Sequence, residues 1–315
     1  MASARASAPG KVILFGEHAV VYGEPAIAVA LSLRTEVTLR EAPGEKAHRV
    51  NGAPMNPHHH AYIKDAVDRL WEGPPLDIRT ESRIPSASGL GSSAALSVAT
   101  TGALLEAQGR FSEELVAREA YNAEVSAQKG RGSPTDTSTS THGGAVLVDR
   151  EKGAGFLWDV SRGERRWYLH ALDVPPLTLV VGFTGQRGRT ADEVAKVARF
   201  VKRGAFGREV IRDLGQVTRE ARQLLEDRET LALGVAMDDA HNLLTVLGVS
   251  THKLDRLCEA AREHAYGAKL TGSGGGGSMI ALTDTPEACA KAIAKRGGIP
   301  HVVQLGGAGV SASSL

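Results

Sequence analysis

The chain has 315 residues, 42% of them hydrophobic and 23% charged, so it can bury cores in about two globular domains. Its 37 Lys and Arg balance 36 Asp and Glu, which argues against a global basic surface for nucleic acid or an anionic membrane. No segment approaches the ~20 apolar residues of a spanning helix, so we expect no membrane association. Cys258 and Cys289 form no disulfide or metal-binding pattern, and we expect a cytoplasmic protein.

Strand and helix patterns are mixed along the first half of the chain. The predicted strands are 12–15, 26–32, 35–40, 75–82 and 143–150. The predicted helices are 61–71, a segment from Ser92 that ends at Gly109, and 112–130. The last of these has Ser112 as its cap, with two glutamates in its first turn.

The pattern loosens around 160–175, and a strand at 177–185 begins the second half. The further elements predicted there are helices at 190–201, 208–225, 252–264 and 286–298, and strands at 279–284 and 301–305. Because strands and helices do not alternate strictly, an α+β fold is favoured over a doubly wound sheet. We expect two domains, 1–175 and 176–315.

One segment, GRGSPTDTSTSTHGG at 130–144, is unusual in composition. From Ser133 to Thr141 seven of nine side chains are hydroxyls, and Asp136 is the one acid among them. Such clusters usually form loops, so we predict a loop here. Asp136 is either an incidental charge or the reactive group of a built site.

A second segment, SGLGSSAAL at 88–96, places Ser92 and Ser93 at the start of a helix. A helix N-terminus offers free N–H groups to a phosphate, and serine hydroxyls can supply oxygen to Mg²⁺. The alternative is a plain serine N-cap on an alanine-rich helix. The segment lacks the GxxxxGK[ST] pattern of a P-loop.

Two more segments carry candidate functional residues. Residues 269–282, KLTGSGGGGSMIAL, contain four consecutive glycines, whose backbone must be approached closely by another element or by a ligand. Residues 7–31 place Lys11 at the start of a strand, with Glu17 and His18 at its far end. These charges could form one wall of a polar site, although a lysine beside a strand usually faces solvent.

Taken together, PGKVILFGEHAVVYG, PSASGLGSSAALSV and KLTGSGGGGSMIAL resemble, in this order, the motifs of the GHMP kinase superfamily. GEHAVVYGEPAIAVAL and residues 237–277 are similar to the mevalonate kinases, in particular their archaeal branch. The resemblance runs from about Ala8 to Val303. It implies a GHMP kinase fold, with an N-terminal ribosomal-protein-like domain, a C-terminal ferredoxin-like α+β domain, and ATP bound between them.

The resemblance also implies an activity, the ATP-dependent phosphorylation of mevalonate at its 5-hydroxyl, with ATP and Mg²⁺ as cofactors. The residues it implies for ATP binding are Pro85, Ser88, Gly89, Leu90, Gly91, Ser92, Ser93, Ala94, Gly274 and Gly275. Those for Mg²⁺ are Ser92 or Ser93 together with Glu124. Those for the substrate are Lys11, Glu17, His18, Asp136 and Thr190.

In this scheme Asp136 takes the proton of the attacking hydroxyl, and the charge of Lys11 keeps the carboxylate ionised and stabilises the developing alkoxide. Either Arg189 or Lys11 would meet the carboxylate of the substrate. Mevalonate is the expected partner, and a homodimer is compatible with the sequence.

The chain departs from the family pattern near Asp136. Glu124 stands twelve residues before Asp136, where the family has eleven, and one extra residue in the intervening segment would account for this. Pro134 replaces the usual glycine and stiffens the approach to Asp136. The glycine pair 143–144 keeps its spacing of seven residues after the acid.

Two other functions compete with this one. A phosphomevalonate kinase or a kinase of the 3-hydroxyl is the nearest, but a phosphorylated substrate should require extra basic residues around 16–18. A non-catalytic ligand sensor with the same fold would need neither Lys11 nor Asp136.

Overall fold

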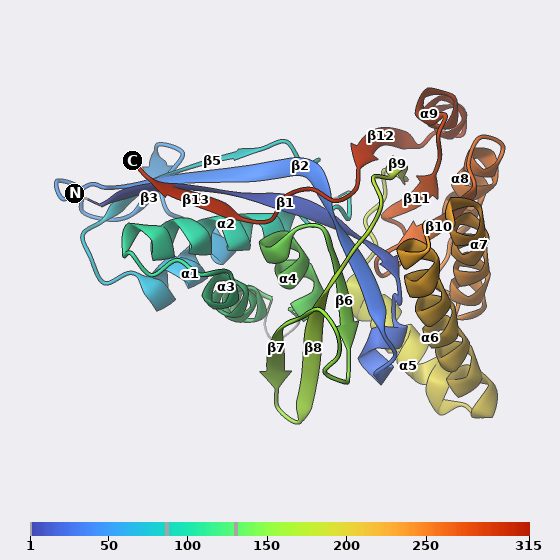
Figure 1. Ribbon diagram of the computed structural model, residues 1–315. Coiled ribbons are helices and arrows are strands. Elements are labelled where there is room, and N and C mark those ends of the chain that lie inside the picture. The colour runs from blue at the N-terminus through green and yellow to red at the C-terminus, as the bar shows by residue number, and fades with distance from the viewer. Residues whose placement is uncertain (1, 86–87, 129–131) are drawn as a thin grey trace.

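The computed structural model describes residues 2–85, 88–128 and 132–315, and within these ranges the chain forms two β-sheets with helices packed on them (Figure 1). The strands of the larger sheet are β1 (Ser3–Phe15), β2 (Ala26–Glu41), β3 (Arg49–Val50), β4 (Ala53–Pro54), β5 (Leu76–Ser82), β6 (Ala145–Asp149), β7 (Phe156–Arg162), β8 (Arg165–Leu172) and β13 (Ser311–Ser314). Their order is β4-β3-β5-β2-β6-β8-β7, and β1 lies between β2 and β13. The α+β fold class is confirmed.

β2 is a single long strand where two strands, 26–32 and 35–40, were predicted. One edge of β2 pairs with β1, and its other edge pairs first with β6 and then with β5. No glycine or proline interrupts residues 26–41, and the backbone stays extended between the two predicted strands. This strand connects the part of the sheet near the chain ends to the part that meets the second half.

Helices cover one face of this sheet. They are α1 (Ala61–Leu70), α2 (Ser92–Ala107) and α3 (Glu113–Ala127), followed by α4 (Pro134–His142), while a short 3₁₀ turn, η1 (Ala19–Tyr22), follows β1. α2 is buried along most of its length because alanine, serine and threonine let it approach β1 and β2 closely. The predicted cap of α3 is confirmed, since the Ser112 side chain accepts a hydrogen bond from the Leu115 N–H.

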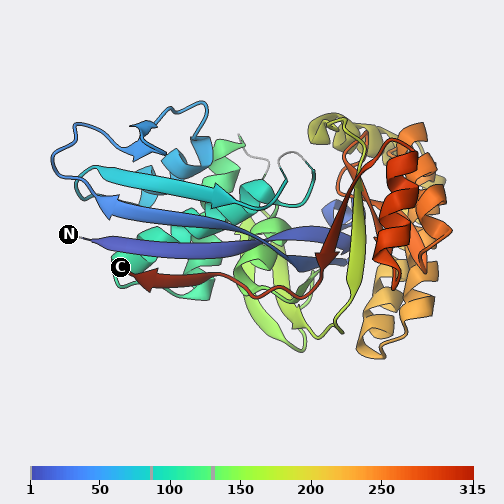
Figure 2. The same ribbon diagram turned by 90° about the horizontal axis from the view of Figure 1, so that it is seen from above.

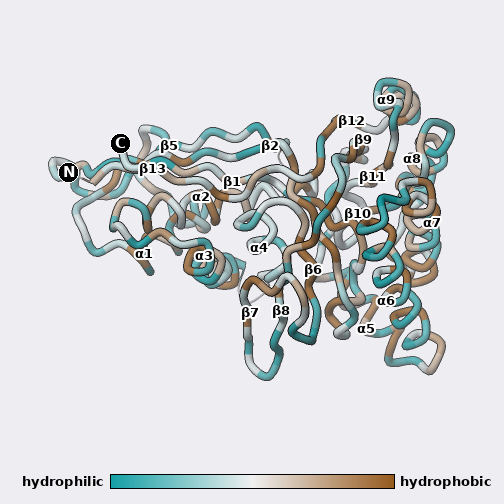
Figure 3. Tube along the Cα trace, in the orientation of Figure 1, coloured by the Kyte–Doolittle hydropathy of each residue, from teal (hydrophilic) through white to brown (hydrophobic). Residues whose placement is uncertain are grey.

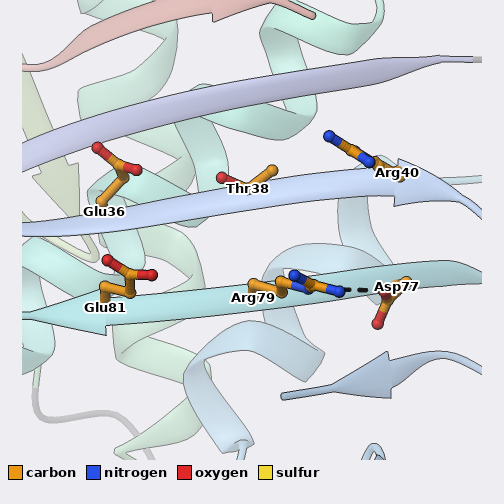
Figure 4. Close-up of a pocket in the computed structure, with 6 residues that line it drawn as sticks. All are labelled: Glu36, Thr38, Arg40, Asp77, Arg79 and Glu81. Atoms are coloured by element: carbon orange, nitrogen blue, oxygen red, sulfur yellow. Dashed lines mark ion pairs between the residues drawn. The ribbon is translucent and has the colours of Figure 1, made fainter. Parts of the chain in front are cut away.

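The opposite face of β2 and β5 is polar. Figure 4 shows the side chains that line a shallow hollow there: Glu36, Thr38, Arg40, Asp77, Arg79 and Glu81. Val37 and Leu39, which alternate with them along β2, are fully buried against the helices. The alternation that predicted a half-buried strand at 35–40 is therefore confirmed.

The hydroxyl-rich segment forms helix α4, so the prediction of a loop is wrong for residues 134–142, while its residues 130 and 131 lie outside the described ranges. Pro134 is the first helical residue, where a missing N–H costs nothing. Buried hydroxyls donate to backbone carbonyls one turn earlier, Thr139 to Thr135 at 2.7 Å and Thr141 to Thr137 at 2.8 Å. Tertiary burial thus overrides a composition with low helix propensity.

The second half contains the smaller sheet and five labelled helices. Its strands are β9 (Thr178–Phe183), β10 (Gly267–Thr271), β11 (Ser278–Leu282) and β12 (Ile299–Gln304), in the antiparallel order β10-β11-β9-β12. Its helices are α5 (Thr190–Lys202), α6 (Ala205–Glu226), α7 (Thr230–Val246), α8 (His252–Arg262) and α9 (Pro286–Lys295). Figure 2 shows α6 to α9 gathered beyond this sheet, on the side away from the larger one.

The two sheets share a core. The largest cluster of buried apolar side chains runs from β1 and β2 through the smaller sheet into α6, α7 and α8. In Figure 3 the trace of α6 changes between teal and brown along the helix, as expected for an amphipathic helix with one face on this core. Within the described ranges, no helix is both long enough and apolar enough to span a bilayer.

Several elements were not predicted: α7, β10, β13 and the hairpin of β7 and β8. α7 contains Gly234, which ordinarily weakens a helix, but a Cβ at this position would lie 2.3 Å from the Tyr266 carbonyl oxygen. The glycine is thus required where α7 meets the start of β10. β13 pairs with β1, so the end of the chain returns to the first sheet.

Candidate active site

An ion pair between Lys11 and Asp136 lies at the centre of the candidate site. Lys11 follows a register shift in β1, and Asp136 is in the first turn of α4. The Lys11 Nζ is 2.9 Å from the Asp136 Oδ2, and the two side chains are 6% and 22% exposed. The helix N-terminus favours the negative charge of the carboxylate. The structure therefore brings together the two residues that the sequence marked as the reactive pair.

The 88–91 loop lies directly against Lys11. The Lys11 N–H donates to the Leu90 carbonyl oxygen at 2.9 Å, and a Cβ on Gly91 would come within 2.9 Å of the Lys11 Cγ. Gly91 is the N-cap of α2, with φ +75° and no capping side chain, so the interpretation of this segment as a serine N-cap is wrong. The first N–H groups of α2 thus lack a capping side chain, as an anion site at a helix start requires.

Glu124 lies near this pair, in the last turn of α3, and is 1% exposed. Its Oε1 accepts a hydrogen bond from the Gln128 side chain at 2.9 Å. Burial, reinforced by the charge of Asp136, raises the pKa of Glu124 to about 8. Among the described residues, the Glu124 Oε2 and the Asp136 Oδ1 are buried oxygens without a hydrogen-bond partner.

Tyr62 of α1 connects Ser93 with these acids. The side chains of Ser93 and Gln128 lie close enough to its hydroxyl to affect its pKa. Burial raises the pKa of Tyr62, and the charge of Glu124 raises it further. Of the two predicted serine ligands, Ser93 therefore has a contact that relates it to Glu124. Tyr62 itself was not predicted, because a tyrosine in a helix carries no sequence signal for a site.

The turn at Gly16–His18 joins the two halves of the molecule. Glu17 is buried and accepts a hydrogen bond from the buried Lys269 of β10. His18 has φ +62°, and its Nε2 lies 3.0 Å from the Ser273 carbonyl oxygen. Burial lowers the pKa of His18, so its imidazole is neutral at pH 7. Lys269 was not assigned a role, since nothing in the sequence pairs it with residue 17.

The two candidates from the start of α5 lie in different surroundings. The Thr190 hydroxyl is 3.2 Å from the Ser273 hydroxyl, which places it on the same loop that His18 contacts. The Arg189 side chain is 87% exposed and lies 3.5 Å from the Asp192 carboxylate. Thr190 thus joins the His18 side of the site, whereas the structure gives Arg189 no contact with it.

The glycine loop 274–277 packs against backbone. The Gly275 N–H donates to the Val249 carbonyl at 2.8 Å, and a Cβ on Gly274 would lie 2.2 Å from the same oxygen. The Ser278 hydroxyl donates to the Ser88 carbonyl, which ties this loop to the 88–91 loop. Of the two explanations for the glycines, close approach by another element is therefore confirmed.

No group of three or more His, Cys, Asp and Glu within the described ranges could hold a metal ion. His241 lies 3.2 Å from the Asp255 carboxylate and 3.9 Å from the Cys258 sulfur, an arrangement that superficially suggests a nucleophilic triad. Burial raises the pKa of the Cys258 thiol, and the side chain is 0% exposed, so this thiol is inert.

The fold and the loops around Lys11 are those of a small-molecule kinase, and the chain belongs to the GHMP kinase family. Residues 61–144 match the GHMP kinases N terminal domain, and residues 221–298 match the GHMP kinases C terminal domain.

Its relatives include several mevalonate kinases. The mevalonate kinase of Methanothermobacter thermautotrophicus is 38% identical over 291 residues, covering 88% of this chain and 89% of that protein. That of Pyrococcus furiosus is 34% identical over 335 residues, covering 95% of each. Among solved structures, L. major mevalonate kinase in complex with R-mevalonate superposes with a TM-score of 0.82 at 27% identity, covering 96% of each chain. The Methanococcus jannaschii mevalonate kinase has a TM-score of 0.79 at 26% identity, covering 96% of this chain and 98% of that one.

Proposed function

We propose that this chain is a mevalonate kinase, which transfers the γ-phosphoryl group of ATP to the 5-hydroxyl of mevalonate and releases ADP. The observation that carries the proposal is the ion pair of Lys11 and Asp136, held against the 88–91 loop in a chain whose relatives are mevalonate kinases. A ligand-sensing protein of this fold would have no use for such a pair.

Asp136 is the proposed base. Its carboxylate accepts the proton of the 5-hydroxyl as the oxygen attacks the γ-phosphorus and the bond from that phosphorus to the bridging oxygen of ADP breaks. Lys11 remains beside both groups and offsets the negative charge that develops on the attacking oxygen and the transferring phosphoryl group. Since such a transition state is stabilised mainly by position and charge, the fixed 2.9 Å contact is the essential feature.

ATP is proposed to bind along the first turn of α2. The backbone N–H groups there would meet its phosphates, and a Cβ on Gly89 would have no atom of the described residues within 4 Å. Pro85, Ser88, Leu90 and Ala94 complete this segment, and Gly274 and Gly275 form the facing backbone wall. ATP would thus lie between the proposed domains, 1–175 and 176–315.

The residues at this site fit Mg²⁺. The ion prefers oxygen ligands, and the unpartnered buried oxygens of Glu124 and Asp136 lack the partner that such groups normally have. We propose Glu124 and the Ser93 hydroxyl as its ligands from the protein, with Ser92 as the neighbouring alternative. Mg²⁺ would supply charge neutralisation for the ATP phosphates.

The mevalonate pocket is proposed to lie on the His18 side of the ion pair. Because the His18 Nε2 donates to a carbonyl, the Nδ1 of the neutral ring is an acceptor for a substrate hydroxyl. Thr190 adds a hydroxyl from the same side, and Lys11 is the cation available to the substrate carboxylate. The free buried thiols of Cys258 and Cys289 support a reducing, cytoplasmic location.

The test is a substrate panel with purified protein and Mg-ATP: mevalonate, 5-phosphomevalonate, homoserine and galactose, each followed by ADP release. The proposal expects turnover with mevalonate alone. Turnover with only 5-phosphomevalonate would show that the chain is a phosphomevalonate kinase. The absence of turnover with all four, together with measurable ligand binding, would favour the sensor.

A further inference from the structure

A buried ion pair joins the turn after β1 to the smaller sheet. Glu17 and Lys269 are 252 positions apart, yet the Lys269 Nζ donates to the Glu17 Oε1 and also to the Leu270 carbonyl oxygen at 2.8 Å. Both side chains are 0% exposed. A buried pair contributes little to stability compared with apolar residues of similar volume, because removing two charges from water is costly. Stability alone therefore does not explain this pair.

The turn that Glu17 occupies is strained. Gly16 has φ +91°, and a Cβ there would collide with Pro25 and Ala26. His18 has φ +62°, a left-handed conformation that costs free energy for a residue with a side chain. Such strain persists only where surrounding contacts determine it.

Three contacts from the second half hold this turn and the strand before it. They are the Lys269 bond to Glu17, the His18 Nε2 bond to the Ser273 carbonyl at 3.0 Å, and the Thr271 hydroxyl bond to the Ile13 carbonyl at 2.8 Å. Of these, the Glu17–Lys269 contact is the one between opposite charges, and it is fully removed from solvent.

The backbone on either side of Lys269 is held by α7. The N–H groups of its neighbours Ala268 and Leu270 donate to Asp238 at 2.9 Å and to the His241 Nδ1 at 3.1 Å, and both acceptors are on α7. The side chain between these two residues, Lys269, extends to Glu17. These two bonds from α7 fix the backbone of β10, and the Leu270 carbonyl of β10 in turn accepts a hydrogen bond from the Lys269 ammonium.

We propose that Lys269 is a positioning residue, which acts through Glu17 to hold the strained turn and thereby aims the His18 imidazole at the mevalonate pocket. The inference rests on the proposed function for the identity of that pocket. Glu17, which the resemblance implied as a substrate residue, has this indirect role in the proposal, because its side chain is 0% exposed and paired with Lys269.

The experiment compares wild type with Glu17→Gln/Lys269→Met, which removes both charges and leaves no unpaired buried ion. We expect the double variant to fold. Its KM for mevalonate should rise on the order of tenfold to a hundredfold, while its KM for ATP stays within about twofold of wild type. Lys64→Met, which removes an exposed ion pair with Asp68 on α1, is the matched control and should leave both constants unchanged.

A second measurement needs no substrate. In ¹⁵N NMR spectra of the imidazoles, His18, assigned by its loss in His18→Gln, should show the neutral tautomer with the proton on Nε2 in wild type. The double variant should show averaging of the two tautomers, since the bond to Ser273 is no longer enforced. If wild type does not phosphorylate mevalonate, the proposed function is wrong. The His18 signal would still show whether the Glu17–Lys269 pair positions the imidazole.

A folded double variant with the wild-type KM for mevalonate and an unchanged His18 signal would overturn the proposal. Equal increases in both KM values would also overturn it, because they would indicate a general disturbance. If the double variant does not fold, Glu17→Gln alone, which keeps the shape of the side chain, is judged by the same two constants and the same signal.

Discussion

Lys11 and Asp136 form a contact of 2.9 Å between the first strand of the chain and the first turn of a helix made largely of threonine and serine. Around this contact lie the 88–91 loop and the buried Glu124. The pair concentrates two opposite charges where a phosphoryl group and a hydroxyl would meet, and it is the basis of the first prediction.

Asp136→Asn should lower kcat by about 10²–10⁴-fold, the usual contribution of a general base, with little change in the KM for ATP. The amide keeps the shape of the carboxylate but cannot take a proton. Steady-state kinetics measure this effect. Asp159→Asn, which removes an exposed ion pair with Arg166, should retain wild-type turnover. An Asp136→Asn enzyme with a near-normal kcat would refute the role of Asp136.

Gly91→Ala should damage activity more than its backbone strain explains. A Cβ at φ +75° costs about 1–2 kcal/mol, and at this position it would also push on the Lys11 side chain from 2.9 Å. Gly52→Ala is the matched control, because its φ is +78° and nothing lies within 4 Å of the new atom. We expect similar losses in the free energy of unfolding by urea, with kcat reduced in Gly91→Ala alone. Equal kcat values would contradict the contact.

Glu124→Gln should raise the Mg²⁺ concentration needed for half-maximal turnover. The loss of a residue that only hydrogen-bonds to a metal ligand lowers metal affinity about 10–100-fold, and the loss of a direct ligand should lower the affinity for Mg²⁺ at least as much. Titration of turnover with MgCl₂ at fixed ATP measures the shift. Glu114→Gln, an exposed position in the first turn of the same helix, serves as the control. An unchanged Mg²⁺ requirement would remove Glu124 from the proposed ligands.

Ser138→Ala should destabilise the protein by about 1–3 kcal/mol, because the buried Trp158 Nε1 donates to the Ser138 hydroxyl at 3.1 Å and would lose its acceptor. Trp158→Phe in the same chain removes the stranded donor, so the double variant should be less destabilised than the sum of the two single variants. Urea unfolding of all four proteins measures the coupling. Strict additivity would mean that this bond does not hold α4.

His241 predicts a pH dependence of stability. Burial lowers its pKa to about 4 from an ordinary 6.5. Between these values the unfolded chain binds a proton that the folded imidazole does not, so the free energy of unfolding falls as pH decreases from 6.5 to 4, by about 3 kcal/mol in all and about 2 kcal/mol by pH 5.

Urea unfolding of wild type and His241→Asn at pH 7 and pH 5 tests this, since asparagine can still accept from the Leu270 N–H but does not titrate. The difference between the two pH values should shrink by about 2 kcal/mol in the variant. His59→Asn, at an exposed loop position, should keep the wild-type difference. If His241→Asn also keeps the wild-type difference in the free energy of unfolding between pH 7 and pH 5, the buried imidazole is not the cause of the pH dependence.

The sequence could predict the loops around Lys11 because their signals are local. A glycine-rich turn before a helix is visible in a few consecutive residues, and the order of the motifs identified the family. The position of Lys11 at the start of a strand was predicted wrongly, because β1 already begins at Ser3. The cap of α3 and the periodicities of α3 and α5 are similarly local, which is why those helices were predicted near their observed bounds.

Other features depend on contacts that no local pattern reveals. α4 is buried against the rest of the fold, and the hydroxyls of Thr139 and Thr141 bond to carbonyls one turn earlier, whereas serine and threonine in isolation favour turns. Lys269 lies in a motif that was noticed for its glycines, yet its partner Glu17 comes from the other end of the chain. Helix propensity does not predict α7, because Gly234 disfavours a helix. The reason for the glycine, its close contact with Tyr266, is visible only in the structure.

The most direct test of the central claim is the identity of the product. Mevalonate and Mg-ATP are incubated with wild type and with Asp136→Asn, and the product is analysed by ³¹P and ¹³C NMR. The account predicts a single phosphate ester on carbon 5 with wild type and no detectable ester with the variant over the same time. An ester at the 3-hydroxyl, or a 5-ester formed equally fast by Asp136→Asn, would contradict it.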